Sequence, residues 1–274
     1  DWICRQFGQK EKKTVHHKKF ADGGEVIVWE TGRAGEEAAS YENLFLRKEI
    51  AGFRTNIRRE QSCSIKSLTR DYLYKQLLSS GEYTFDHMLV IKDPYGEAPL
   101  TALALFILEE PACVRVTTKG NLKETDFVTE LPKKKEHRVP ILGMYAEKAN
   151  DIVIEILDDE GNCVKSHTFT IRTKRLPKSL RNVITVKKWT DKPAYSNIMI
   201  NGGVKIHTCV FDIEGKIRYY LSRKPRGYGI FPLSDGHFFY MEKYISVPSY
   251  SNPQTVESYD MDYFGRVFRT YLTE

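Results

Sequence analysis

Apolar and polar residues alternate in short segments through the middle of the chain, with Gly, Pro and charged clusters between them. This pattern favours strands over helices. It predicts seven strands, at residues 87–92, 100–108, 112–119, 125–131, 137–145, 151–158 and 163–172. Seven short strands in about ninety residues are typical of an immunoglobulin-like β-sandwich. We therefore expect residues 82–173 to form such a domain.

The segment before the sandwich, residues 1–81, is predicted to be a partly helical N-terminal extension. Its basic tract, residues 10–19, is interpreted as a solvated tail, and residues 25–30 predict a short strand. Ser40 is a weak helix cap before an apolar stripe formed by Leu44, Phe45, Ile50 and Phe53. A second helix is expected to start at Ser67 or Thr69 and to end near Ser79-Ser80-Gly81.

An internal repeat follows the sandwich. Residues 174–198 are predicted to be a linker with one strand at 183–186. Residues 210–221 and 258–272 then share an order of aromatic, Asp, Gly, basic and apolar positions, with Asp212 and Asp260 48 positions apart. A period near ~50 residues suits β-propeller blades. Residues 199–274 therefore predict the first one to two blades of a propeller, and the whole chain is expected to be mainly β.

Composition excludes several classes of protein. The net charge of +6 is too mild to indicate nucleic-acid binding by itself. No run approaches the ~20 apolar residues of a membrane helix. The five cysteines have no CxxC spacing and an odd count, so the sequence predicts neither a disulfide framework nor a zinc site.

Two segments of the sandwich carry a family resemblance when they are taken together. One is Asp93-Pro94-Tyr95-Gly96-Glu97-Ala98-Pro99-Leu100-Thr101-Ala102-Leu103, and the other is Val139-Pro140-Ile141-Leu142-Gly143-Met144-Tyr145. A strand beginning at Asn150 and closing on Asp159-Glu160-Gly161 follows. Each piece alone would fit an ordinary β-sandwich. In combination, over roughly residues 82–274, they resemble the N-terminal domain of the bacterial aryl-sulfate sulfotransferases, which use no nucleotide sulfate donor.

The resemblance implies a sandwich followed by a propeller whose central channel holds the active site. In such enzymes a histidine takes a sulfuryl group from a phenolic sulfate and passes it to a phenol. It further implies a periplasmic or exported enzyme, although the start of the sequence shows no signal-peptide pattern, and a homodimer is expected. From the composition and residue patterns above we expect no metal, no nucleic-acid partner and no membrane span, and no cofactor is predicted. The catalytic histidines are expected beyond residue 274, so no catalytic residue is assigned. A non-catalytic sandwich used for binding or dimerisation is the alternative.

Four histidines are weighed as substitutes for the missing nucleophile. His237 lies in an Asp-Gly-His turn, and its predicted role is structural. His137 and His207 precede strands and are interpreted as local hydrogen-bonding groups. His167 is a weak candidate for a substrate contact, and the loop at residues 226–229 is an unsupported candidate for binding sulfate.

Overall fold

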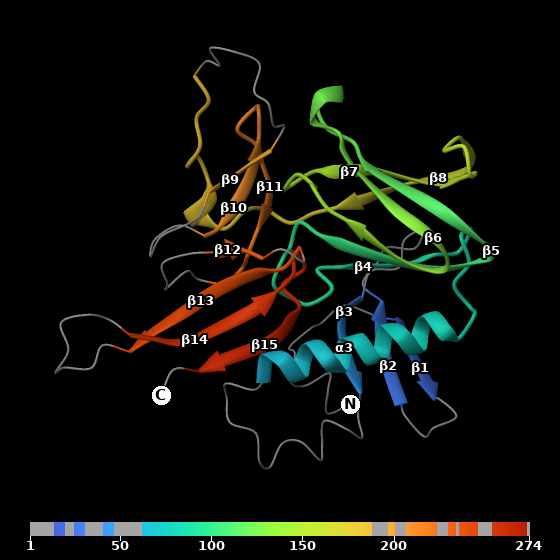
Figure 1. Cartoon of the computed structure of the whole chain (residues 1–274), viewed down its shortest axis with the longest axis horizontal. Helices are drawn as coiled ribbons and strands as arrows, with labels where there is room; N and C mark the ends of the chain where they lie inside the picture. Colours follow the sequence, from blue (N-terminus) through green and yellow to red (C-terminus); the bar gives the residue numbers. More distant parts are fainter. Residues whose placement is uncertain are drawn as a thin grey trace.

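The computed structural model describes residues 14–19, 25–30, 41–46, 62–187, 197–200, 207–223, 230–233, 236–245 and 254–272. The described segments form four sheets and one long helix (Figure 1). The chain is mainly β, as predicted.

The first sheet lies in the N-terminal extension. It joins β1 (Thr14–Lys19), β2 (Glu25–Glu30) and β3 (Tyr41–Leu46) in antiparallel order. The predicted strand at 25–30 is confirmed. The predicted helix after Ser40 is wrong over Tyr41–Leu46, because this segment pairs with β2, and short apolar runs do not separate helix from strand. The rest of that helix prediction, Ile50 and Phe53 included, lies outside the described residues.

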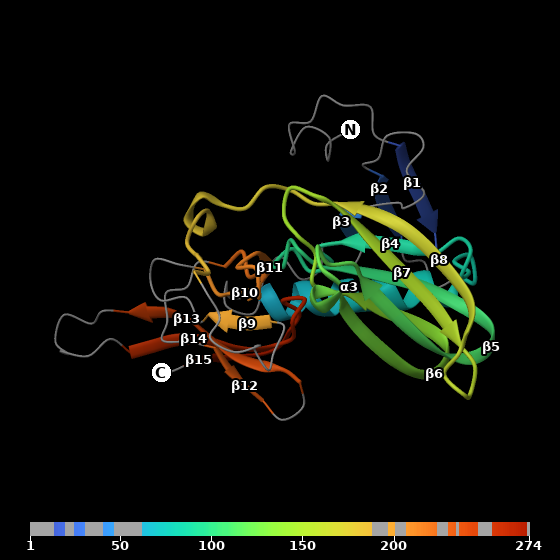
Figure 2. The same ribbon diagram turned by 90° about the horizontal axis from the view of Figure 1, so that it is seen from above.

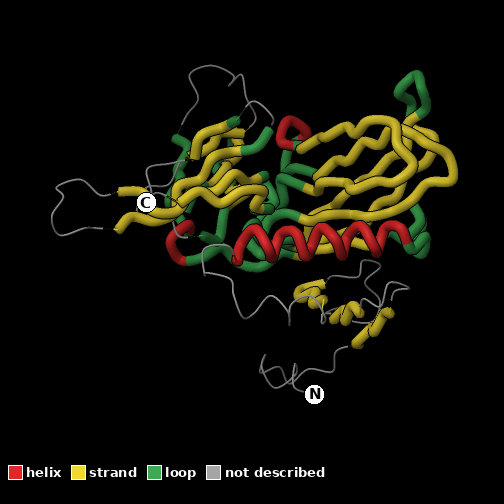
Figure 3. The backbone as a smooth tube through the Cα atoms, turned by 60° about the horizontal axis from the view of Figure 1, so that its bottom comes forward, coloured by secondary structure: helices red, strands yellow, loops and turns green. Residues whose placement is uncertain are grey.

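The second predicted helix is confirmed as α3 (Ser62–Ser79). It ends where Gly81 takes a left-handed φ of 72° and its N–H bonds the carbonyl of Leu78. The predicted start was wrong, since Ser67 lies inside the helix and accepts the backbone N–H of Val267 at 2.9 Å. One face of α3 packs on the sandwich through a cluster of buried apolar residues: Leu73, Tyr74, Leu77, Leu78, Leu89, Ile91, Leu103 and Leu105. Figure 3 shows α3 running along one side of the sandwich.

The sandwich contains five strands instead of the seven predicted. They are β4 (Leu89–Lys92), β5 (Ala102–Thr118), β6 (Phe127–Ile141), β7 (Ala149–Leu157) and β8 (Cys163–Arg172). Two predicted pairs of strands are each one long strand. The break expected around Pro111 is a bulge, where the register between β5 and β6 shifts between Ile107 and Ala112.

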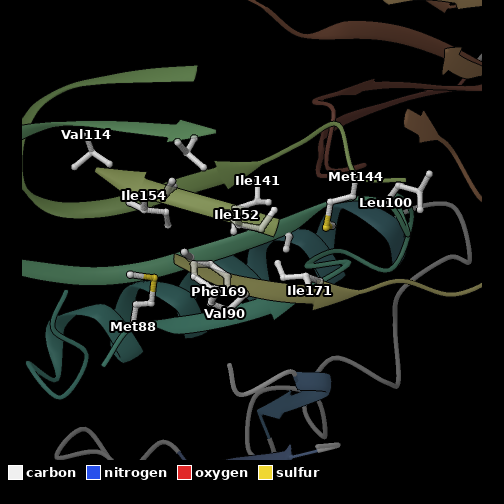
Figure 4. Close-up of a cluster of buried hydrophobic side chains, with 14 of the residues drawn as sticks. Met88, Val90, Leu100, Val114, Ile141, Met144, Ile152, Ile154, Phe169 and Ile171 are labelled. Carbon is white, nitrogen blue, oxygen red and sulfur yellow. The ribbon is translucent and has the colours of Figure 1, made fainter. Parts of the chain in front are cut away.

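The two long strands bend from one layer of the sandwich to the other. The first half of β5 lies between β4 and the end of β6, whereas its second half lies between the start of β6 and β7. β8 then pairs with the outer side of β7. Figure 4 shows the core between the layers, with Ile152 and Ile154 of β7 and Phe169 and Ile171 of β8 filling the space.

Two further antiparallel sheets follow the sandwich (Figures 1 and 2). The first, here called the middle sheet, joins β9 (Asn197–Ile200), β10 (Cys209–Asp212) and β11 (Ile217–Tyr220). The second, the outer sheet, joins β12 (Ile230–Pro232), β13 (Phe238–Ile245), β14 (Gln254–Met261) and β15 (Val267–Leu272) in sequential order. The predicted strand at 183–186 is absent, since these residues are assigned no secondary structure, and a short 3₁₀ helix (Lys178–Leu180) precedes them.

The middle sheet is buried on both faces. Cys209, Phe211 and Ile217 belong to the core of the sandwich. Tyr219 and Leu221 point the other way, into a second core shared with the outer sheet, whose members there include Phe238, Tyr240, Tyr259 and Met261. The sandwich, middle sheet and outer sheet are therefore stacked in that order. Within the described residues these sheets do not close into a ring, and the propeller remains a prediction.

The predicted repeat corresponds to two matching hairpins, β10–β11 and β14–β15. In each, an aspartate begins a four-residue turn that ends on a glycine with φ near 75°, Gly215 in one and Gly265 in the other. Each aspartate accepts two backbone N–H groups, one from within its turn and one from the residue after the glycine. Asp212 therefore corresponds to Asp262, and the predicted match with Asp260 was off by two positions.

Candidate functional site

A buried arginine joins the sandwich to the middle sheet. Arg218 lies in β11 at a bulge, because Val210 pairs with Tyr219 and the next pair is Phe211 with Ile217. Its side chain is 1% exposed and extends into the sandwich. There Nε donates to the carbonyl of Gly143 at 2.6 Å, and Nη1 donates to the carbonyl of Thr125 at 2.8 Å.

Asp212 balances the charge of this guanidinium. Its side chain is fully buried, and Oδ2 lies 3.2 Å from Nη1 of Arg218. The same oxygen accepts a hydrogen bond from the hydroxyl of Tyr145 at 2.9 Å. The other oxygen, Oδ1, accepts the backbone N–H of Glu214 in the turn. Two opposite charges buried together with hydrogen bonds avoid the large cost that either would have alone. Asp212, Arg218 and Tyr145 are called the junction triad below.

Tyr145 is fixed by the loop that follows β6. Asn150 accepts the backbone N–H of Tyr145 at 2.7 Å and donates back to its carbonyl at 3.0 Å. The ring lies under the guanidinium of Arg218, with 4.0 Å between Cζ and the ring centroid. Burial raises the pKa of Tyr145 above its usual value, so the hydroxyl stays protonated and can donate to Asp212.

Gly143 gives the loop its shape. Its φ is 76°, and a Cβ there would lie 2.7 Å from Cβ of Phe127. No other residue fits that space while keeping the carbonyl directed at Arg218. The segment Val139–Tyr145, singled out from the sequence, therefore supplies two members of the contact with the middle sheet.

The other singled-out segment, residues 93–103, contacts the C-terminal sheets as well. Glu97 pairs with Arg223 at 3.0 Å, and its carbonyl accepts the N–H of Ser222 at 2.8 Å. A Cβ on Gly265, in the turn of the outer sheet, would lie 2.2 Å from Cβ of Glu97. Asp93 shapes this loop by accepting the N–H of Ala98 at 2.8 Å, and burial raises the pKa of its carboxyl. Both segments thus lie where the sandwich meets the following sheets.

The four histidines weighed from the sequence lie at four different places. The Nδ1–H of His207 faces the carbonyl of Leu221 at 3.0 Å, which agrees with its predicted local role. His167 lies in β8 with its ring near Phe85 and Phe169. His237 contacts Asp260 at 3.0 Å and stacks on Phe268 at 4.0 Å. None of these contacts brings a histidine to the junction triad, and residues 226–229 lie outside the described ranges.

The side chain of His137 is buried between its own strand, β6, and the ring of Phe106. Its Nε2 lies 2.8 Å from the carbonyl of Lys134, and the ring stacks on Phe106. Burial lowers its pKa below 6.5. On acidification the unfolded chain therefore binds a proton first, and the free energy of unfolding falls as the pH drops through 6.5 toward the lowered folded pKa.

We expect this loss of stability to depend on His137. Urea unfolding at pH 7 and pH 5 should show a smaller pH effect in His137→Gln than in the natural chain. His87→Gln is the control, because His87 is exposed and the substitution should leave the pH effect unchanged. An equal effect in His137→Gln and His87→Gln would contradict the assignment.

Two features are absent from the described ranges. These ranges contain no group of three His, Cys, Asp or Glu side chains placed to hold a metal ion. They also contain no helix with the length and apolar character that crossing a membrane requires. Cys113, Cys163 and Cys209 are free thiols, and burial raises the pKa of Cys209 to about 11.

Sequence reasoning missed Arg218 entirely. Its partners Gly143 and Thr125 lie 75 and 93 positions away, so no local spacing connects them. One signal was present in the repeat. Phe268 occupies the matching position of the second hairpin, so a charged side chain at Arg218 departs from an otherwise apolar position.

This layered arrangement defines an immunoglobulin-like domain whose loops hold a following β-sheet. A family model described as the arylsulfotransferase Ig-like domain matches residues 89–174. Those residues cover β4 to β8 and both singled-out segments. The sandwich is therefore similar to the Ig-like domain of arylsulfotransferases over residues 89–174, which are less than half of the chain. A comparison with curated proteins gives no match.

Proposed function

We propose that this chain is the N-terminal part of an aryl-sulfate sulfotransferase. In this proposal the middle and outer sheets are the first two blades of a propeller, and the sandwich anchors them. The enzyme would move a sulfuryl group from a phenolic sulfate to a phenol through a histidine supplied by later sheets. The family match over residues 89–174 carries the proposal.

The stacking of the sheets supports the proposal that the middle and outer sheets are propeller blades. The middle sheet is covered on both faces, whereas the outer sheet keeps aromatic side chains on the face away from the middle sheet. Phe239 and Tyr271 lie there with ring centroids 5.7 Å apart, and Tyr271 is 43% exposed. A blade cannot bury both faces alone, and a further sheet stacked on this face would cover these rings.

The test compares the 274-residue chain with the product of its whole open reading frame. Both are incubated with 4-nitrophenyl sulfate, with and without phenol, and release of 4-nitrophenolate is followed by absorbance. We expect phenol-dependent release by the whole product and none by the 274-residue chain. Failure of the whole product to transfer would overturn the proposal and favour the binding or dimerisation module.

A further inference from the structure

A groove lies at the end of the sandwich that points away from the middle sheet (Figure 1). It is lined by the bulge of β5, the segment before β4 and the turn between β7 and β8. Its volume is about 660 Å³, within the range of pockets that hold ligands. β7 runs from Asn150, which holds Tyr145, to Leu157 in the groove. At about 3.3 Å per residue these positions are roughly 23 Å apart, so the groove is separate from the junction triad.

Part of the lining is apolar. Phe85 and Leu108 belong to the core of the sandwich. Ile107 and Ile156 are only half-buried, and Val164 is 67% exposed. Partly covered apolar side chains gain free energy when a ligand removes the rest of their surface from water. An apolar group of a ligand would therefore bind favourably against these three side chains.

The charged part of the lining is mostly acidic. Two lysines face six carboxylates, which belong to Asp86, Glu109, Glu110, Asp158, Asp159 and Glu160. Both lysines are already paired. Lys165 lies 2.7 Å from Asp86, and Lys133 pairs with Asp159. The lysines therefore leave an excess of negative charge in the groove.

Three of these carboxylates have no cation beside them. Glu109 and Glu110 lie in the bulge of β5, and Glu160 lies in the turn between β7 and β8. All three side chains are exposed, and none forms an ion pair within the described ranges. The groove is thus negative, although the chain carries a net charge of +6. Because salt screens charges over about 8–10 Å, this local charge decides which ligand the groove attracts.

The two parts of the lining together select a cationic ligand with an apolar group. The carboxylates repel nucleic acids and anionic lipid headgroups. A peptide matches both parts, because its lysine or arginine side chains pair with the carboxylates and an apolar side chain between them covers the apolar surface.

We propose that this groove binds a basic peptide segment of a partner protein, in which an apolar side chain lies between lysines or arginines. The apolar side chain contacts Ile107, Ile156 and Val164, and the cations lie beside the three free carboxylates. This binding needs neither the junction triad nor sulfuryl transfer, so the two proposals can fail independently.

The probe is a short fluorescent peptide with one leucine between two pairs of lysines. It is titrated into the 274-residue chain, and binding is followed by fluorescence anisotropy. We expect saturable binding that weakens as salt is added. Replacing the leucine by glycine should weaken binding about tenfold, because the apolar contact is lost. No saturable binding, or equal affinities of the leucine and glycine peptides, would overturn the proposal.

Spermine separates a peptide from a simple polycation. It carries several positive charges but no apolar side chain, and it is added as a competitor to the bound peptide. We expect spermine to displace the peptide only at much higher concentration than the unlabelled peptide does. Equal potency of spermine and the unlabelled peptide would overturn the proposal and favour a polyamine as the ligand.

Two charge-reversal variants locate the binding. Glu110 lines the groove, whereas Glu124 lies in the 3₁₀ helix Lys123–Thr125 at the junction end of the sandwich. Both side chains are exposed, so Glu110→Lys and Glu124→Lys should fold and have the same net charge. We expect peptide affinity to fall about fivefold in Glu110→Lys and to change by less than about twofold in Glu124→Lys. Equal losses in both variants, or no loss in Glu110→Lys, would contradict the site.

Discussion

Replacing Arg218 with methionine is expected to reduce the free energy of unfolding by about 3–5 kcal/mol. The substitution keeps much of the side-chain volume but leaves the buried carboxylate of Asp212 without its cation. It also removes the donors to the carbonyls of Gly143 and Thr125. Urea unfolding followed by far-UV circular dichroism measures the loss.

Arg115→Met is the matched control for this substitution. Arg115 pairs with Glu130 at 2.8 Å, but its side chain is 29% exposed and water screens the pair. We expect a change of about 1 kcal/mol or less. The double variant Arg218→Met with Asp212→Asn should lose less than the sum of the single changes, because it leaves no buried charge unpaired. A cost for Arg218→Met no larger than that for Arg115→Met would refute the role of the junction triad.

The second large effect is expected at Gly143. Gly143→Ala introduces strain at a positive φ and brings a methyl group 2.7 Å from Cβ of Phe127. Left-handed strain and overpacking together are expected to cost about 2–5 kcal/mol. The loop can relieve the contact only by moving the carbonyl that Arg218 uses.

Gly161→Ala separates the two contributions. Gly161 has a similar φ of 85°, but a Cβ there would meet nothing within 4 Å. Only the backbone strain remains, so urea unfolding should show a loss of about 1–2 kcal/mol. If the two alanine variants were equally stable, the close approach to Phe127 would have no energetic role.

Local patterns in the sequence were sufficient for much of the fold. Alternation located the sandwich, i, i+4 spacing located α3, and the Asp and Gly positions located both C-terminal hairpins. Local patterns failed where long-range pairing decides the outcome. Pro111 suggested a strand break, yet pairing on both sides of it with β6 makes β5 one bulged strand. Tyr41–Leu46 form a strand because β2 lies beside them.

Only part of the candidate site could be predicted from the sequence. The two singled-out segments were correctly chosen, but their physical role was not visible until Gly143 and Tyr145 were placed against β11. The partners of Arg218 in the sandwich, Gly143 and Thr125, lie 75 and 93 positions away, and the hairpin pattern did not show that Arg218 pairs with Asp212, six positions before it. Its importance follows from burial, which depends on the whole stack of sheets.

We expect the sandwich and the middle sheet to unfold together, because they share one hydrophobic core. Native-state hydrogen exchange of backbone amides in β7 and β10 tests this most directly. In Tyr145→Phe, which removes only a hydroxyl from the junction triad, the opening free energy should fall by the same amount in both strands. Faster exchange confined to β10, with β7 unchanged, would contradict it.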